Sequence, residues 1–213
     1  MRCAIRSFAV ITPILALTAA SFGQVTLVSQ SRSIDPNTIG PAAGFGPYAD
    51  SASISNQMFN TAASASQTSD LSITGATFHM GASGTGSGSH STSLLTFTFN
   101  ALPGVMYTLD GTGDQGGGPG TFVSGSISIS LIGPGVNDHE TITNFHAVSI
   151  HTLGTLSGGE YTLTISVQGF GTFQQGSPRT GSAFFDGALT LTPTPGAAAL
   201  LALAAIPTSR RRR

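Results

Sequence analysis

The feature that most constrains the fold of this chain is a period-two alternation of apolar and small hydroxyl side chains in its middle. Ile127, Ile129 and Leu131 alternate with serines, and similar alternation surrounds Phe97 and Leu163. Such alternation is typical of β-strands that bury one face, because successive side chains of a strand point to opposite sides. Only 8% of the residues are charged, whereas exposed helix faces ordinarily carry Glu and Lys. The pattern therefore predicts strands rather than helices.

Turn signals separate these runs at short intervals. Gly and Pro cluster at 102–104, 133–135 and 157–159, and such clusters mark reversals of the chain. Strands with one apolar face and frequent turns pack as antiparallel sheets, face to face. The sequence therefore predicts an all-β antiparallel β-sandwich, jelly-roll-like, with about eight to ten strands.

Three segments depart from the alternation. Between Leu71 and Met80 the apolar phase changes at Gly75, which predicts a β-bulge. The segment 40–60, rich in Gly, Pro, Ala and Ser, is interpreted as a long loop or an irregular edge. The low-complexity segment 81–91 is interpreted as a loop.

The N-terminus has the parts of a secretory signal peptide. Arg2 and Arg6 precede an apolar run, and small residues follow up to Gly23, so cleavage is expected between Gly23 and Gln24. The alternative, a membrane anchor, needs an apolar helix of about 20 residues, which is longer than this run. The signal peptide is expected to form a short helix. It contains Cys3, the one cysteine of the chain, so its removal leaves a domain without cysteine.

The C-terminal segment 193–213 combines a Pro/Gly stop, a short apolar run at 197–206 and a terminal group of cations. The stop is Pro193, Thr194, Pro195 and Gly196, and the cations are Arg210, Arg211, Arg212 and Arg213. These parts in this order resemble the PEP-CTERM sorting signal of exopolysaccharide-producing bacteria, in the Pro-Thr-Pro-Gly form associated with planctomycete proteins. Thr194 stands where the family typically has Glu. The alternative is a disordered basic tail.

The resemblance implies a short apolar C-terminal helix and a processing partner. An exosortase-like membrane protease would act at the stop, signal peptidase would act at the other end, and the tail would associate with the membrane transiently or stably. The terminal arginines would stay in the cytoplasm by the positive-inside rule. The predicted organisation is therefore a signal peptide at 1–23, a sandwich domain at 24–192 and a sorting signal at 193–213, exported to the bacterial cell surface or beyond.

The charge of the predicted domain argues against nucleic-acid partners. Residues 24–192 contain two basic residues, Arg32 and Arg179, against all nine acidic residues of the chain. A surface of this kind repels a polyphosphate.

One segment has the composition of a cation site. Asp110 and Asp114 lie in a Gly-rich stretch, and oxygen ligands at alternate positions suit Ca²⁺. The stretch departs from an EF-hand loop at Gln115 and Thr121, and Asp and Gly are also common in ordinary turns. Ca²⁺ is therefore one interpretation, and no cofactor is the other.

Metal ligation by histidine and catalysis find little support. His139, Glu140 and His146 do not have the spacing of a common metal motif. Neither a Gly-x-Ser-x-Gly elbow nor a His-Glu-x-x-His motif occurs. The chain is therefore not predicted to be an enzyme.

Four aromatic side chains are candidates for stacking against a sugar: Tyr48, Tyr107, Tyr161 and Phe173. The alternative for Tyr107 and Tyr161 is core packing, because both are in phase with apolar strand positions. Three hypotheses follow. The first is a structural surface or matrix protein held within exopolysaccharide. The second is a non-catalytic glycan-binding module, and the third is a calcium-stabilised adhesin domain.

Overall fold

The computed structural model describes residues 25–35, 45–58, 60–116, 124–142, 147–174 and 176–192, all of them strands, turns and short connections. The predicted signal peptide with Gly23 and Gln24, the sorting signal with Pro193 and Arg210, and both terminal helices lie outside these residues. Within the described ranges, no helix has the length and apolar character that crossing a membrane requires.

The described residues form twelve strands. In chain order these are β1 (Val25–Asp35), β2 (Tyr48–Asn56), β3 (Thr61–Ser72), β4 (Gly75–Thr85), β5 (His90–Ala101), β6 (Met106–Gly116), β7 (Ser124–Gly133), β8 (Val136–Ile142), β9 (Val148–Thr155), β10 (Gly159–Phe170), β11 (Thr172–Gln174) and β12 (Ser177–Thr192).

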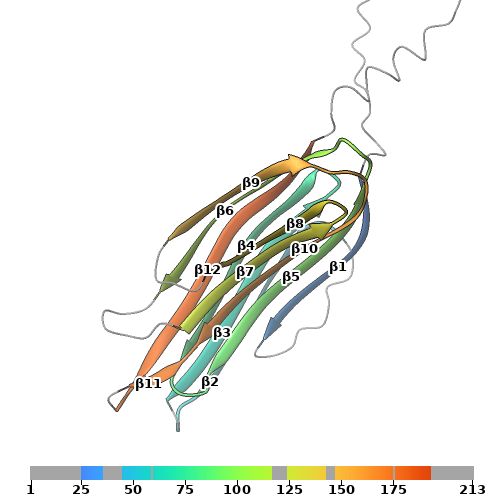
Figure 1. Ribbon diagram of the computed structural model, residues 1–213. Coiled ribbons are helices and arrows are strands. Elements are labelled where there is room, and N and C mark those ends of the chain that lie inside the picture. The colour runs from blue at the N-terminus through green and yellow to red at the C-terminus, as the bar shows by residue number, and fades with distance from the viewer. Residues whose placement is uncertain are drawn as a thin grey trace, which may run out of the picture. The chain divides into compact units, whose positions relative to one another are not determined.

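The strands form two sheets that lie one over the other (Figure 1). The five-stranded sheet has the order β1-β5-β10-β7-β8, and the seven-stranded sheet has the order β2-β3-β4-β12-β6-β9, with β11 paired to β12. Every pairing is antiparallel. From β4 to β12 the chain passes between the sheets as it does in a jelly roll, with β4-β12-β6-β9 facing β5-β10-β7-β8 and with β7 and β8 forming a hairpin within one sheet.

The predicted jelly-roll-like sandwich is confirmed. The described chain has more strands than the predicted eight to ten because β1, β2 and β3 widen the two sheets at one side, and β11 adds a short hairpin. The predicted turns at 102–104, 133–135 and 157–159 separate β5 from β6, β7 from β8 and β9 from β10.

The core contains the apolar positions that the alternation indicates. Leu95, Phe97 and Phe99 on β5 are fully buried, as are Leu163 and Tyr161 on β10. The ring of Phe99 stacks between its neighbours, with centroids 5.4 Å from Phe97 and 5.7 Å from Tyr161. Because burial of one such side chain contributes about 1.5–3 kcal/mol, this aromatic row is a major part of the apolar core.

The predicted loop at 81–91 is mostly strand, because the two sheets approach each other closely there, with only small side chains between them. A Cβ atom on Gly169 of β10 would lie 2.5 Å from the backbone Cα of Ser83 on β4. A Cβ atom on Gly84 would lie 2.6 Å from the backbone nitrogen of Gly171. The Ser91 hydroxyl donates to the Ser83 carbonyl oxygen at 2.9 Å across this contact. The close approach of the two sheets therefore requires glycine at positions 84 and 169, and it places the small side chain of Ser91 at the contact.

Two other expectations are refined. Residues 71–80 do not form one bulged strand: β3 ends at Ser72, and β4 begins at Gly75 with φ +134°. The phase change is thus a tight hairpin, which glycine allows because its φ is positive. In the segment 40–60, the described residues contain β2, an edge strand of the seven-stranded sheet. The segment is thus an edge there, but β2 pairs with β3 in an unbroken register and is not the expected irregular edge.

One buried cation links the two sheets beside that edge. Arg32 on β1 is 2% exposed, and its guanidinium donates to the carbonyl oxygen of Gly46 at 2.9 Å. The same group lies 5.1 Å from the ring centroid of Tyr48 at the start of β2, within the range of a cation–π contact. Burial lowers the pKa of Arg32. These contacts position β2 against β1.

Candidate functional site

The outward side of the seven-stranded sheet is polar across its central strands. We call it the polar face. It consists of Ser64, Ser66, Thr68 and Asp70 on β3; Thr77, His79, Gly81 and Ser83 on β4; Ser182, Phe184, Asp186 and Ala188 on β12; and Asp110, Thr112 and Asp114 on β6. All of these residues are exposed or half-buried. No Lys or Arg lies among them.

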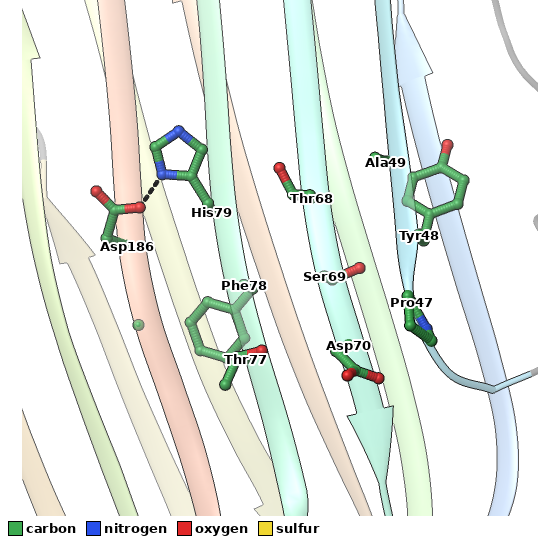
Figure 2. A pocket seen from close by; sticks show the side chains of 11 residues that line it. Pro47, Tyr48, Ala49, Thr68, Ser69, Asp70, Thr77, Phe78, His79 and Asp186 are labelled. Carbon is green, nitrogen blue, oxygen red and sulfur yellow. Dashed lines mark hydrogen bonds and ion pairs between the residues drawn. The ribbon is translucent and has the colours of Figure 1, made fainter.

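Two histidine–carboxylate pairs lie on or beside this face. His79 on β4 is directly opposite Asp186 on β12, and its Nδ1 contacts the Asp186 Oδ1 atom (Figure 2). In the same way, Nδ1 of His151 on β9 contacts Oδ1 of Asp110 on β6. Both histidines are 63% exposed, and the carboxylates are 46% and 56% exposed. Each pair leaves Nε2 of the imidazole as the remaining polar ring atom.

Two shallow hollows meet at Asp186. One, of about 530 Å³, is bordered by Tyr48, Asp70 and His79. Figure 2 shows it lying across β2, β3, β4 and β12, with Thr68 between the Tyr48 and His79 strands. The other hollow, of about 520 Å³, is bordered by Asp110, His151 and Asp186. Together they form an open depression that crosses the strands.

An exposed aromatic ring lies next along β12. Phe184 is 43% exposed and points outward, two residues before Asp186. Its neighbour on β4 is Gly81, which has no side chain to cover the ring. A hollow of about 300 Å³ beside the ring is lined by serines, and among these the hydroxyls of Ser64 and Ser83 are hydrogen-bonded at 2.8 Å. A ring beside hydroxyls and carboxylates gives both an apolar surface and polar contacts.

The predicted calcium loop is instead part of strand β6. Asp110 and Asp114 both point to the polar face, four residues apart in the strand. At about 3.3 Å per residue their Cα atoms are about 13 Å apart, whereas Ca²⁺ binds its oxygen ligands at about 2.3–2.6 Å. The two carboxylates therefore do not share one ion. Within the described ranges, no three His, Cys, Asp or Glu side chains are grouped to hold a metal.

The glycines of that segment are strand residues because a ring from another strand fills their space. Phe185 on β12 is fully buried and stacks on Phe78, with centroids 5.7 Å apart. A Cβ atom on Gly111 would lie 2.2 Å from the Phe185 ring, and one on Gly113 would lie 2.7 Å from Ile127. The ring thus lies beneath the polar face, at the level of the two histidine–carboxylate pairs.

The four aromatic candidates from the sequence do not form one platform. Tyr161 and Tyr107 are 0% and 5% exposed, so the core-packing alternative is correct and neither ring is open to a sugar. Tyr48 is half-buried beside Arg32, and burial, followed by the nearby Asp50 carboxylate, raises its pKa. Phe173 is 54% exposed on β11. Of the four, Tyr48 alone borders a hollow of the polar face.

Sequence reasoning missed Phe184. The sequence pattern that could have revealed it is the alternation along β12. On this strand the apolar residues of one side are buried: Ala183, Phe185, Leu189 and Leu191. Extending that alternation backwards from Leu189 puts Phe184 on the outer side. His139 and Glu140, considered for metal binding, lie on β8 of the other sheet, and His146 lies outside the described residues.

Tyr107 supplies a pH-dependent contact between the sheets. Its hydroxyl donates to Oδ2 of Asp138 on β8 at 2.6 Å. Burial, together with this hydrogen bond, raises the pKa of Tyr107 to about 12. Because the folded pKa lies above the ordinary value of about 10, the unfolded chain loses this proton first. The contact therefore stabilises the fold fully below pH 10, and its contribution is lost as the pH rises to about 12.

We expect urea unfolding between pH 10 and 12 to show this loss. The wild-type protein should lose stability more steeply in this window than Tyr107→Phe, which has no phenol to ionise. At pH 8 the variant should be less stable by about 1.5–3 kcal/mol, since a hydrogen bond to a carboxylate is removed. Parallel pH profiles for the two proteins would contradict the assignment.

Comparisons with known proteins identify no family for this chain. No protein-family model matches it, and no curated protein matches it. The carbohydrate-binding module TmCBM61, solved in complex with beta-1,4-galactotriose, aligns over 68% of this chain and 88% of its own, with 9% identity and a TM-score of 0.30. The enzymatically active domain of bacteriophage CBA120 tailspike protein 4 aligns over 79% of this chain and 19% of its own, with 10% identity and a TM-score of 0.28. Both likenesses are too low to bear on function.

Proposed function

We propose that this chain is an exported, non-catalytic protein of a bacterial cell surface or extracellular matrix, which binds polysaccharide through its polar face. Export is inferred from the terminal segments 1–23 and 193–213 alone. The observation that carries the binding proposal is the exposed Phe184 ring on the same side of β12 as Asp186 of the His79–Asp186 pair, two residues away. This combination offers a sugar ring an apolar surface and hydrogen-bonding groups on one open sheet.

The chemistry of the polar face fits a hydroxylated ligand. A carboxylate is an acceptor only, and an imidazole nitrogen can donate or accept, so Asp186 and His79 complement the hydroxyl groups of a sugar. The apolar C–H side of a pyranose can lie on the uncovered ring of Phe184, because aromatic faces bind apolar and weakly positive groups. Shallow hollows that cross the strands suit a polysaccharide that lies along the protein surface. A site that binds the end of a polysaccharide would instead need a closed pocket.

The charge of the face favours neutral polysaccharide over acidic polysaccharide. Asp70, Asp110 and Asp186 border the two central hollows. The buried Arg32 interacts with Asp70 from the inner side of the sheet, but no Lys or Arg is among the residues of the polar face itself. A polyuronate would therefore meet like charges and bind more weakly at low salt. A neutral glycan meets no such repulsion.

Binding fits this site better than catalysis does. A histidine–carboxylate pair can act as a general base, but the largest electrostatic contributions to catalysis arise in sites that exclude water. Both histidines here are 63% exposed on an open sheet. We therefore favour a site that holds a glycan over one that cleaves it.

Affinity electrophoresis of the purified full-length chain in gels containing a neutral galactan tests the proposal. The wild-type protein should be retarded, and Phe184→Ala should raise the dissociation constant about tenfold, as expected for a loss of about 1.4 kcal/mol of stacking. Phe173→Ala is the matched control, since Phe173 is also an exposed phenylalanine, at 54%, but lies on β11. It should bind as the wild type does.

The outcomes are distinct. Alginate, a polyuronate, should retard none of the proteins. Equal loss of binding in the Phe173 and Phe184 variants would reject the polar face as the site. Failure of the wild-type protein to bind neutral polysaccharides, including material extracted from the producing cells, would reject the binding function.

A further inference from the structure

One polar side chain from each of five neighbouring strands lies in a single row across the outer side of the seven-stranded sheet. The strand registers place each member directly opposite the next, in the order Thr68 on β3, His79 on β4, Asp186 on β12, Thr112 on β6 and Ser149 on β9. We call these five residues the transverse row. Neighbouring strands are about 4.8 Å apart, so the row is about 19 Å long. Asp186 is half-buried, and the other four residues are exposed.

The two hollows that meet at Asp186 follow this row. The hollow of about 530 Å³ extends over β2, β3, β4 and β12 (Figure 2), and the hollow of about 520 Å³ extends over β12, β6 and β9. Every member of the transverse row lines one of the two hollows, and Asp186 lines both. Asp186 therefore lies in the middle of an open depression rather than at its end.

The three hydroxyl groups of the transverse row are open to a ligand. Elsewhere on the outer side of this sheet, facing hydroxyls bond to each other, as those of Ser64 and Ser83 do at 2.8 Å. Within the described part of the chain, no group is hydrogen-bonded to the hydroxyl of Thr68, Thr112 or Ser149. Because a hydroxyl can donate and accept, each of them can bond a sugar hydroxyl without first breaking a contact within the protein.

We infer that the polar face binds an internal segment of a linear, extended and neutral polysaccharide, which lies across the strands along the transverse row. This inference rests on the proposed function and specifies its ligand. Each ring of an extended glycan advances by about the distance between neighbouring strands, ~4.8 Å, so successive rings meet successive members of the row. About five rings would cover the row. A coiled glycan, such as an α-1,4-linked glucan, turns away from the sheet and contacts only part of it.

The centre and the ends of the row contribute to binding differently. Phe184 precedes Asp186 by two residues on the same side of β12, so a short glycan at the centre can contact both. Thr68 and Ser149 are each two strands away from Asp186, which is about 10 Å. Only a longer glycan reaches them. Affinity should therefore increase with chain length, because each added ring gains hydrogen bonds with the row.

Isothermal titration calorimetry of the purified full-length chain with β-1,4-linked manno- and galacto-oligosaccharides of two to six rings tests this inference. Affinity should rise with the number of rings up to about five, the number that covers the row, and then level off. Maltohexaose, an α-1,4-linked glucan, is the matched ligand, because it has six rings and no charge but a coiled shape. It should bind no more tightly than the disaccharides.

Variants at the two ends of the row test the direction of the glycan. Thr68→Ala and Ser149→Ala should each weaken binding of the pentasaccharides about threefold to tenfold, as expected for the loss of one hydrogen bond, and should leave binding of the disaccharides unchanged. Thr190→Ala is the matched control. Thr190 is exposed on the outer side of β12, four residues from Asp186 and so about 13 Å away along the strand. This variant should bind the pentasaccharides as the wild type does.

Each outcome decides the inference. Equal affinities for disaccharides and pentasaccharides would overturn it, as would binding of maltohexaose as tight as that of the β-1,4-linked hexasaccharides. Loss of binding in Thr190→Ala, with none in Thr68→Ala and Ser149→Ala, would show that the glycan runs along the strands and would also overturn it. A wild-type chain that binds neutral polysaccharide in gels but none of these oligosaccharides would reject the inference alone. A chain that binds neither would reject the proposed function as well.

Discussion

Gly169→Ala should lower the free energy of unfolding by about 3 kcal/mol, the upper part of the range for adding atoms to a packed interior. The added Cβ atom would lie 2.5–2.7 Å from backbone atoms of Ala82 and Ser83 on the facing sheet. Backbone atoms of a central strand cannot rotate away as a side-chain end can. The sheets must therefore separate at this end, which also weakens the hydrogen bond from Ser91 to Ser83.

Urea denaturation of the variant and of Gly81→Ala measures this effect. Gly81 also lies within β4 but faces outward, where a Cβ atom would meet the Ser66 hydroxyl oxygen at 3.2 Å and no other heavy atom within 4 Å. Gly81→Ala should therefore be close to neutral, or slightly stabilising through the entropy of the unfolded chain. Equal stability of Gly169→Ala and the wild type would show that the two sheets do not touch at this end.

Phe185→Ala should destabilise the protein by about 3–5 kcal/mol, because it empties the space beneath the polar face. Phe185 is fully buried, and its ring occupies the space above Gly111 on the neighbouring strand. Gly111→Ala alone should cost about 1–3 kcal/mol through overpacking against that ring. In the Phe185→Ala background the added methyl group enters the vacated space, so its cost should largely disappear.

A double-mutant cycle measures this coupling, which we expect to be about 1–3 kcal/mol in favour of the double variant. Phe99→Ala is the control. Phe99 is also fully buried, but it stacks on Tyr161 and Phe97 in the other sheet. Its effect should add to that of Gly111→Ala without coupling. Additive effects of Phe185→Ala and Gly111→Ala would contradict the packing that makes β6 a strand.

These two predictions concern the places where sequence reasoning was weakest. Alternation identified β5, β7, β10 and the end of β12, because their inward positions are large and apolar. It failed at the second halves of β6 and β4, where the inward positions include Gly111 and Gly113 on β6 and Ala82 and Gly84 on β4. Gly111 is buried under Phe185, which is far away in the sequence, and Gly84 is buried under the backbone at Gly171. No local pattern in a glycine-rich segment shows which distant atoms will fill it.

The candidate site was harder to predict than the fold. His79 faces Asp186 because β4 pairs with β12 in one particular register, and that register depends on the whole jelly roll. The strand phase of Tyr107 and Tyr161 indicates the core, and their burial confirms the core-packing alternative. The outward position of Phe184 follows from the alternation of β12, when the alternation at Leu189 and Leu191 is continued toward the start of the strand. The terminal signals and export stay predictions.

The central claim is that the outer side of the seven-stranded sheet holds a neutral polysaccharide around Phe184 and Asp186. Titration of the isotope-labelled chain with soluble neutral polysaccharides, among them a galactan and neutral material extracted from the producing cells, followed by amide chemical shifts in NMR spectra, tests it most directly. We predict that the largest changes fall on β4 and β12 between His79 and Ser83 and between Ser182 and Asp186, with little change on β7 and β10. Largest changes on the five-stranded sheet, or no changes at saturating concentrations of any of these neutral polysaccharides, would contradict the claim.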